Sequence, residues 1–268
     1  MNTSTTNQIA VNGITVSYEV AGSGPWLILS HSLGCSKTMW QPQFAELAKS
    51  YRVLAYDTRG HGASSAPPGP YTLDLLAQDV HELCLALGIT KCHFVGLSMG
   101  GMIGQTVALN YPDLLLSLTL ADTSSAYGPA ALPFWLGRAQ TALSQGMAAL
   151  VAPSLERWFT APFRAAQAAL MVQAGQWLLD TPAVGYAACC LAIAPLDTTA
   201  RLPQITVPVL VIVGAEDAAT PPAAAELIHA QIPGSRLLKL PSAAHLSSVE
   251  QPAAFNRALR EFLQNAPD

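Results

Sequence analysis

Short apolar runs recur along the chain, and helix-length segments separate most of them. Residues 9–20 alternate apolar and polar positions around Asn12-Gly13, a dipeptide suited to the positive φ angles of a tight turn, which predicts an opening β-hairpin. The later strand-sized apolar runs are 26–30, 52–56, 93–97, 116–121, 209–213 and 236–240. Strands that alternate with helices predict an α/β fold with a mostly parallel sheet and helices on both faces. We expect a last helix from about 253 to 265.

The strand pattern is interrupted between residues 121 and 207. This stretch is rich in Ala, Leu, Gln and Trp and carries prolines at 129, 133, 153, 162, 182 and 195, which indicates short helices broken by prolines. Because strands resume afterwards, we interpret residues 124–200, the lid segment, as a helical insertion into a single domain spanning 1–268. We expect it to act as a lid or cap over the sheet edge, the alternative being a purely packing role.

Composition and charge narrow the classes of function. Apolar residues make up 51% of the chain and charged residues 11%, which is enough apolar material for a sheet buried on both faces. The formal charge of -4 leaves no basic field with which to hold nucleic acid. No apolar stretch reaches the roughly 20 residues that cross a membrane, and the polar residues 1–8 do not resemble a secretory signal.

The number and spacing of the cysteines indicate the redox conditions of the compartment in which the protein is found. There are five cysteines, an odd number, and Cys189 and Cys190 are sequence neighbours with poor geometry for a bridge between them. Free thiols in a reducing compartment fit best, so we expect a cytoplasmic protein. A homo-oligomer is left open.

The strongest chemical signal is the pentapeptide GLSMG at 96–100, which follows an apolar strand and precedes a helical run at 102–111. A G-x-S-x-G sequence between a strand and a helix is typical of a nucleophile elbow. The turn is so sharp that side chains at the flanking positions would clash with the backbone, hence the glycines. The elbow exposes Ser98 at the carboxyl edge of the sheet, and we predict that Ser98 is the nucleophile.

A serine hydroxyl needs a base with a pKa near 7 within hydrogen-bond reach. His245 lies in a small-residue loop after the last strand, where it can project over the carboxyl edge of the sheet, and we predict that it is the base. His31 and His61 lie in loops near the same edge and remain alternatives. The other histidines fall in predicted helices or at the start of a strand.

The third member must be a carboxylate that orients the imidazole. Asp217 follows the strand at 209–213, and the order Ser98, Asp217, His245 is the one expected of a nucleophile elbow. Glu216, one residue away, and Asp122, which ends an earlier strand, are the alternatives. Asp122 could instead cap a turn.

Attack on a carbonyl produces an oxyanion, which requires preorganised N–H donors. One donor should be the backbone amide of Met99. The other should come from the loop at 31–34, whose small residues let the backbone approach a substrate, and Leu33 is our candidate. The alternative is that this loop is only a turn.

Four stretches carry a resemblance to a known family: HSLGCSKTMW at 31–40, the run at 56–73, GLSMGGMIGQ at 96–105 and GAEDAATPP at 214–222. Together they resemble the 3-oxoadipate enol-lactonases of the α/β-hydrolase superfamily, over most of the sheet domain and less over the lid segment. The resemblance implies hydrolysis of a five-membered enol-lactone bearing an acetate arm to 3-oxoadipate, a step in aromatic-acid catabolism. Ser98, Asp217 and His245 match the family's triad.

The acetate arm of such a substrate needs a cation or several donors to replace its water. Within the lid segment, Arg138 is the candidate cation and Trp135 the candidate apolar wall, and the alternative is a solvated arginine beside a core tryptophan. We expect Trp158 and Trp177 to belong to the core. If Arg138 does not bind the carboxylate, the next candidates are Arg157, Arg164 and polar donors in the loops.

Metal and cofactor motifs are missing from the sequence, which has no C-x-x-C and no H-E-x-x-H, so we expect neither a metal nor a cofactor. Cys35 is expected to be a small buried thiol. Competing functions are a general carboxylesterase, a cofactor-free peroxidase-like relative with the same triad, and a silent ligand-binding relative. A haloalkane dehalogenase is disfavoured because serine stands where that chemistry needs a carboxylate nucleophile.

Overall fold

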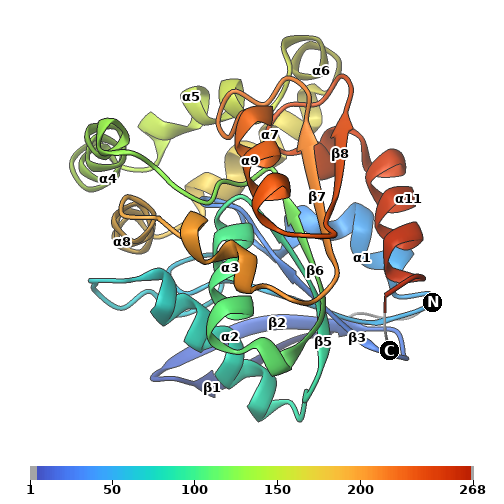
Figure 1. The fold of residues 1–268 in the computed structure, drawn as a ribbon. Coiled ribbons are helices and arrows are strands. Elements are labelled where there is room, and N and C mark those ends of the chain that lie inside the picture. Colours follow the sequence, from blue (N-terminus) through green and yellow to red (C-terminus); the bar gives the residue numbers. More distant parts are fainter. Residues whose placement is uncertain (1–4, 267–268) are drawn as a thin grey trace.

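An eight-stranded sheet runs through the computed structural model, which describes residues 5–266 (Figure 1). The strands are β1 Thr5–Val11, β2 Ile14–Ala21, β3 Trp26–Ser30, β4 Arg52–Tyr56, β5 Cys92–Leu97, β6 Leu115–Ala121, β7 Val209–Gly214 and β8 Arg236–Leu240. Their order across the sheet is β1-β2-β4-β3-β5-β6-β7-β8. The hairpin β1-β2 and its pairing with β4 are antiparallel, whereas β4, β3 and β5 to β8 are mutually parallel.

The apolar runs of the sequence correspond to β3 to β8, with strand ends that differ by no more than one residue. The predicted hairpin is also confirmed: Asn12 and Gly13 have φ angles of 46° and 75° at the turn between β1 and β2. Every residue of β5 and β6 is buried, because these central strands are covered on both faces.

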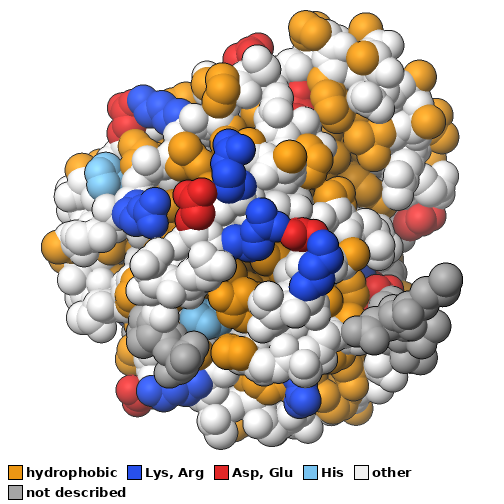
Figure 2. Space-filling view, turned by 90° about the vertical axis from the view of Figure 1, so that its right-hand side faces the viewer, with side chains coloured by type: hydrophobic (Ala, Val, Ile, Leu, Met, Phe, Trp, Pro, Cys, Tyr) orange, Lys and Arg blue, Asp and Glu red, His pale blue; other side chains and the backbone are white. Residues whose placement is uncertain are grey.

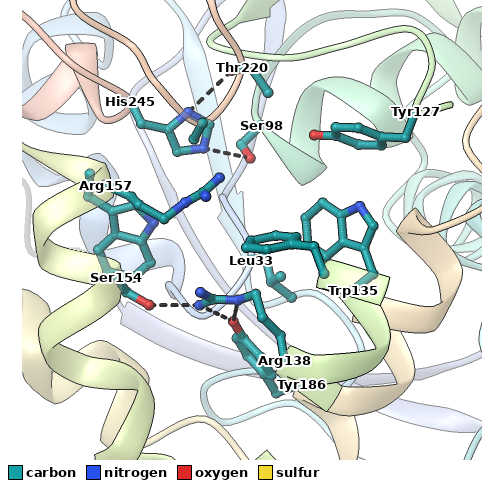
Figure 3. Close-up of a pocket in the computed structure, with 13 residues that line it drawn as sticks. Leu33, Ser98, Tyr127, Trp135, Arg138, Ser154, Arg157, Tyr186, Thr220 and His245 are labelled. Carbon is teal, nitrogen blue, oxygen red and sulfur yellow. Dashed lines mark hydrogen bonds between the residues drawn. The ribbon is translucent and has the colours of Figure 1, made fainter. Parts of the chain in front are cut away.

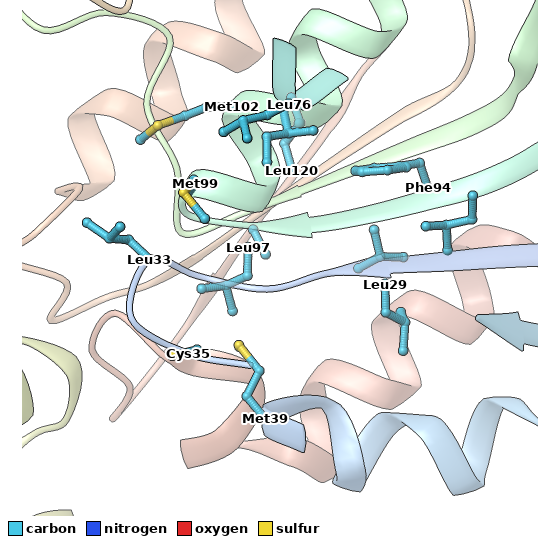
Figure 4. Packing of buried hydrophobic residues seen from close by; sticks show 14 of the residues in the cluster. Leu29, Leu33, Cys35, Met39, Leu76, Phe94, Leu97, Met99, Met102 and Leu120 are labelled. Atoms are coloured by element: carbon cyan, nitrogen blue, oxygen red, sulfur yellow. The ribbon is translucent and has the colours of Figure 1, made fainter. Parts of the chain in front are cut away.

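Helices cover the sheet on both sides (Figure 1). Those outside the lid segment are α1 Gln41–Leu47, α2 Leu73–Ala86, α3 Met99–Asn110, α9 Pro222–Gln231, α10 Ser247–Glu250 and α11 Pro252–Leu263. Helices α2 and α3 pack together, and α3 and α9 lie against strands of the sheet, while α1 packs on α11. Figure 4 shows Met99, Met102 and Leu76 on the side of β5 that α3 covers, with Phe94 and Leu120 on the same side.

Between β6 and β7 the chain forms helices above the ends of the strands (Figure 1). They are α4 Leu132–Gln145, α5 Ala148–Trp158, α6 Ala161–Ala166, α7 Ala168–Leu179 and α8 Ala183–Ile193. Pro133 and Pro162 lie in first helical turns, where a missing N–H costs nothing. Helix α5 continues through Pro153, so this proline does not separate two helices as the sequence suggested.

The described residues contain no helix long and apolar enough to cross a membrane. All five cysteines are free and buried, as expected, and Cys35 is completely inaccessible. On the face seen in Figure 2, basic and acidic side chains are interspersed and no broad basic patch forms.

Candidate active site

Ser98 lies in a sterically demanding turn between β5 and α3. Its φ angle is 56°, a left-handed value that non-glycine residues rarely adopt. A Cβ atom on Gly96 would lie 2.1 Å from the carbonyl oxygen of Gly100, and one on Gly100 would lie 2.1 Å from that of Ser30. The two glycines therefore let three backbone segments meet under Ser98, as the elbow pattern predicted.

Three loops at the carboxyl ends of strands bring Ser98, His245 and Asp217 together, and Figure 3 shows the ring of His245 beside Ser98. The Oγ of Ser98 is 2.9 Å from Nε2 of His245, and Nδ1 of His245 is 2.9 Å from Oδ2 of Asp217. All three side chains are less than 9% exposed. This hydrogen-bonded series has the geometry that lets an imidazole take a proton from a serine and a carboxylate stabilise the resulting cation.

The carboxylate of Asp217 accepts further hydrogen bonds. The backbone N–H groups of Ala219 and Thr220 donate to its Oδ1, and the hydroxyl of Thr220 donates to its Oδ2. Burial would raise the pKa of Asp217, but the charge of His245 and these hydrogen bonds outweigh it, so its pKa lies below its ordinary value. Asp217 is thus held as an anion. Thr220 escaped the sequence analysis, because its position three residues after Asp217 carries no motif.

The two alternative histidines accept hydrogen bonds from backbone N–H groups instead. Nε2 of His31 accepts from the N–H of Thr58, and Nε2 of His61 accepts from the N–H of Gly34. Burial, together with the nearby His31, lowers the pKa of His61 to about 3, and burial also lowers the pKa of His31. Both rings are neutral supports of the loops that follow β3 and β4.

The two alternative carboxylates, Glu216 and Asp122, have different surroundings. Glu216 is exposed, whereas Asp122 is completely buried and accepts from the N–H of Gly214 at 2.8 Å and the hydroxyl of Ser247 at 2.5 Å. Burial, with the charge of Asp217 adding to it, raises the pKa of Asp122. Asp122 thus fastens the loops after β7 and β8 to the end of β6, and these loops carry Asp217 and His245.

The two candidate oxyanion donors are backbone N–H groups that have no hydrogen-bond acceptor in the described residues. Met99 is the first residue of α3, where an N–H has no partner within the helix, and Leu33 lies in the loop after β3. Within residues 5–266 neither amide donates a hydrogen bond. Leu33 also lines the pocket in front of Ser98 (Figure 3). Both amides are available for a charged oxygen.

A small pocket, with a cavity volume of about 40 Å³, opens in front of Ser98 and His245. The lid segment supplies most of its wall: Tyr127, Phe134, Trp135, Arg138, Ser154, Arg157, Trp158 and Tyr186. Trp135 is 8% exposed, and its ring meets that of Tyr127 edge-on at 5.3 Å. No group of three or more His, Cys, Asp or Glu residues in the described part of the chain could hold a metal ion.

Arg138 points into this pocket rather than into solvent (Figure 3). Its Nε donates to the hydroxyl of Tyr186 at 2.8 Å, and its Nη2 donates to the hydroxyl of Ser154 at 2.7 Å. Both acceptors are neutral hydroxyls, so they fix the guanidinium in place without cancelling its charge.

Trp158 is buried in the hydrophobic core, as expected, and it also lines the pocket. Trp177 is buried and is not among the lining residues. Ser154, Arg157 and Trp158 are three and four residues apart on α5, so one face of this helix turns toward Ser98. That spacing was the available signal, but the sequence does not say which face of α5 meets the sheet edge.

Direct hydrogen bonds join the lid segment to the loop of His245. The carboxylate of Glu250, 5% exposed, accepts from the N–H of Ala244 and from both the N–H and the hydroxyl of Thr160. The N–H of Leu246 donates to the carbonyl oxygen of Trp158 at 3.0 Å. The end of α5 is therefore fixed relative to His245 from both sides of the histidine.

Comparisons of the sequence and of the structure with known proteins both find α/β-hydrolases and enol-lactonases. The model of the α/β-hydrolase fold family matches residues 25–252. The chain is 39% identical to 3-oxoadipate enol-lactonase 2 of Acinetobacter baylyi over 96% of each sequence. Its structure superposes on the crystal structure of the enol-lactonase from Burkholderia xenovorans LB400 with a TM-score of 0.93 and 39% identity, covering 97% of this chain and all of that one. A malate-bound thermophilic esterase from Thermogutta terrifontis has a TM-score of 0.92 and 32% identity, with coverage of 97% and 98%.

Proposed function

This chain belongs to the α/β-hydrolase fold family, and we propose that it hydrolyses 3-oxoadipate enol-lactone to 3-oxoadipate in aromatic-compound catabolism. The observation that supports this most is the hydrogen-bonded series of Ser98, His245 and Asp217 at one end of a small pocket whose wall carries arginine. The activities named for the enol-lactonase relatives agree with it.

The reaction begins at the lactone carbonyl. Ser98 Oγ attacks the carbonyl carbon while Nε2 of His245 takes the hydroxyl proton, and Asp217 stabilises the imidazolium that forms. The carbonyl oxygen becomes an oxyanion that accepts from the N–H groups of Leu33 and Met99. Removing one such donor costs about 3 kcal/mol in comparable sites.

Collapse of this intermediate opens the ring. The bond between the carbonyl carbon and the ring oxygen breaks, and the departing enolate takes the proton that His245 holds. The enol that forms tautomerises to a ketone, which makes it a good leaving group. The acyl group then remains as an ester on Ser98. His245 next removes a proton from water, the resulting hydroxide attacks the ester, and Ser98 leaves with the proton that His245 returns. The product carries a second carboxylate where the lactone carbonyl was.

We assign the binding of the acetate arm to Arg138, with Trp135 as the apolar wall. Tyr186 and Ser154 hold the guanidinium in a fixed direction, which lowers the entropy lost when a carboxylate binds. In this proposal helices α4 to α8 act as a lid that supplies specificity, while the sheet edge supplies the reacting groups.

The free state of all five cysteines fits a reducing compartment, and we propose that the protein is cytoplasmic.

Replacing Arg138 by Ala tests the substrate. We expect kcat/KM for the enol-lactone to fall about a hundredfold, because a charge-assisted pair worth about 2–3 kcal/mol is lost. A neutral lactone with the same ring and a methyl group in place of the acetate arm should react nearly as before. Initial rates with both lactones give the answer.

The control is Arg236→Ala, which removes the same charge from an exposed position on β8. An equal loss for both lactones in Arg138→Ala would mean that Arg138 holds the pocket wall through Tyr186 and Ser154 instead of binding a carboxylate.

A further inference from the structure

A second arginine, Arg157, reaches into the pocket closer to the reacting groups than Arg138 does. Figure 3 shows its guanidinium extending toward His245 and Ser98, whereas Arg138 lies beyond it, beside Tyr186. The two guanidinium carbons flank the same ring: that of Arg157 lies 4.6 Å from the ring centre of Phe134, and that of Arg138 lies 5.6 Å from it. Two cations therefore occupy successive positions along one small pocket.

Neither cation is held in an ion pair by the residues that the structure describes. In the described part of the chain, the guanidinium of Arg157 also donates no hydrogen bond. Asp217 acts on Arg157 electrostatically, but its carboxylate already serves His245 and Thr220. Burial and, after it, the charge of Arg138 lower the pKa of Arg157. This unfavourable arrangement is relieved when an anion enters.

The proposed reaction increases the negative charge that the pocket must accept. The lactone brings one carboxylate, on its arm, and ring opening creates a second at the carbon that was bonded to Ser98. The new carboxylate therefore forms at the Ser98 end of the pocket, toward which Arg157 extends, while the arm lies at the end where Tyr186 holds Arg138 (Figure 3). One guanidinium is then available for each carboxylate.

We propose that Arg157 and Arg138 together form a binding site for short dicarboxylates, in which Arg157 takes the carboxylate next to Ser98 and Arg138 the distal one. The identity of the natural dicarboxylate as the reaction product rests on the proposed function, but the two-cation site does not. The same pairing predicts that product binds more tightly than monocarboxylates of equal length and slows turnover as it accumulates.

Calorimetric titration with adipate and hexanoate tests this site without relying on catalysis. These six-carbon acids differ in whether the second end carries a carboxylate. We expect the wild-type protein to bind adipate at least about tenfold more tightly than hexanoate. In Arg157→Gln, and separately in Arg138→Gln, the ratio of the two Kd values should fall close to one, because each variant leaves a single guanidinium.

Arg236→Gln is the matched control, since it removes a positive charge from an exposed site on β8, and it should keep the wild-type ratio. Equal affinities of the wild-type protein for adipate and hexanoate would overturn the proposal whether or not the variants fold. So would an unchanged ratio in folded Arg157→Gln. Tight adipate binding without lactone hydrolysis would defeat only the proposed function, and lactone hydrolysis without adipate preference would defeat only this inference.

Discussion

Ser98→Ala is expected to lower kcat at least about a thousandfold for the enol-lactone and for simple esters alike, while the fold stays intact. The variant loses the only atom that forms a bond to the substrate, and the removed hydroxyl supports no other described residue except through His245. Initial rates give the loss, and circular dichroism with thermal melting checks the fold. Ser144→Ala, at an exposed position on α4, serves as the control.

The same mechanism predicts the loss of kcat when Ser98 and His245 are replaced together. His245→Ala should cost about as much as Ser98→Ala, and the double variant should be hardly worse than either, because the three residues act as one unit. Near-normal turnover by a folded Ser98→Ala protein would remove Ser98 from the mechanism. Losses that multiply in the double variant would show that Ser98 and His245 do not act as one unit.

Gly100→Ala is expected to damage the fold severely, and Gly137→Ala is its matched control. The added Cβ at position 100 would lie 2.1 Å from the backbone oxygen of Ser30, and no side-chain movement can relieve that contact. At position 137, inside α4, nothing lies within 4 Å. We expect Gly100→Ala to lose about 3 kcal/mol or more of unfolding free energy, or to yield no folded protein.

Gly137→Ala should be neutral or should stabilise α4 by up to about 1 kcal/mol, since alanine is the better helix former. Chemical denaturation of both variants, with activity measured on the folded fraction, makes the comparison. Similar stability and activity in the two variants would contradict the close approach of β3 to the start of α3.

The sequence predicted the sheet and the reacting groups for a common reason. Apolar runs set the strands, and parallel strands direct their carboxyl ends to one edge, so loops after β5, β7 and β8 must meet there. Ser98, Asp217 and His245 each directly follow or lie near such a strand end, which made their proximity predictable from local patterns.

Other residues have roles that the sequence did not reveal, because they form hydrogen bonds with residues far away along the chain. Asp122 joins Gly214 and Ser247, and Glu250 joins Thr160 and Ala244, by hydrogen bonds that no local motif announces. The pocket wall depends likewise on how α5 is rotated. This orientation is set by packing against α4 and α7, so the sequence could not show that the core residue Trp158 also lines the pocket, and Arg157 remained one of several further candidates.

We expect this enzyme to be specific for the enol-lactone that carries an acetate arm. The most direct measurement is kcat/KM of the wild-type protein for 3-oxoadipate enol-lactone beside the methyl-substituted lactone and p-nitrophenyl acetate. Because two guanidinium groups line the pocket in front of the nucleophile, we predict that the acetate-bearing lactone is preferred about a hundredfold or more over the methyl-substituted ring. Equal or faster hydrolysis of the neutral substrates would contradict the claim and make the protein a general carboxylesterase.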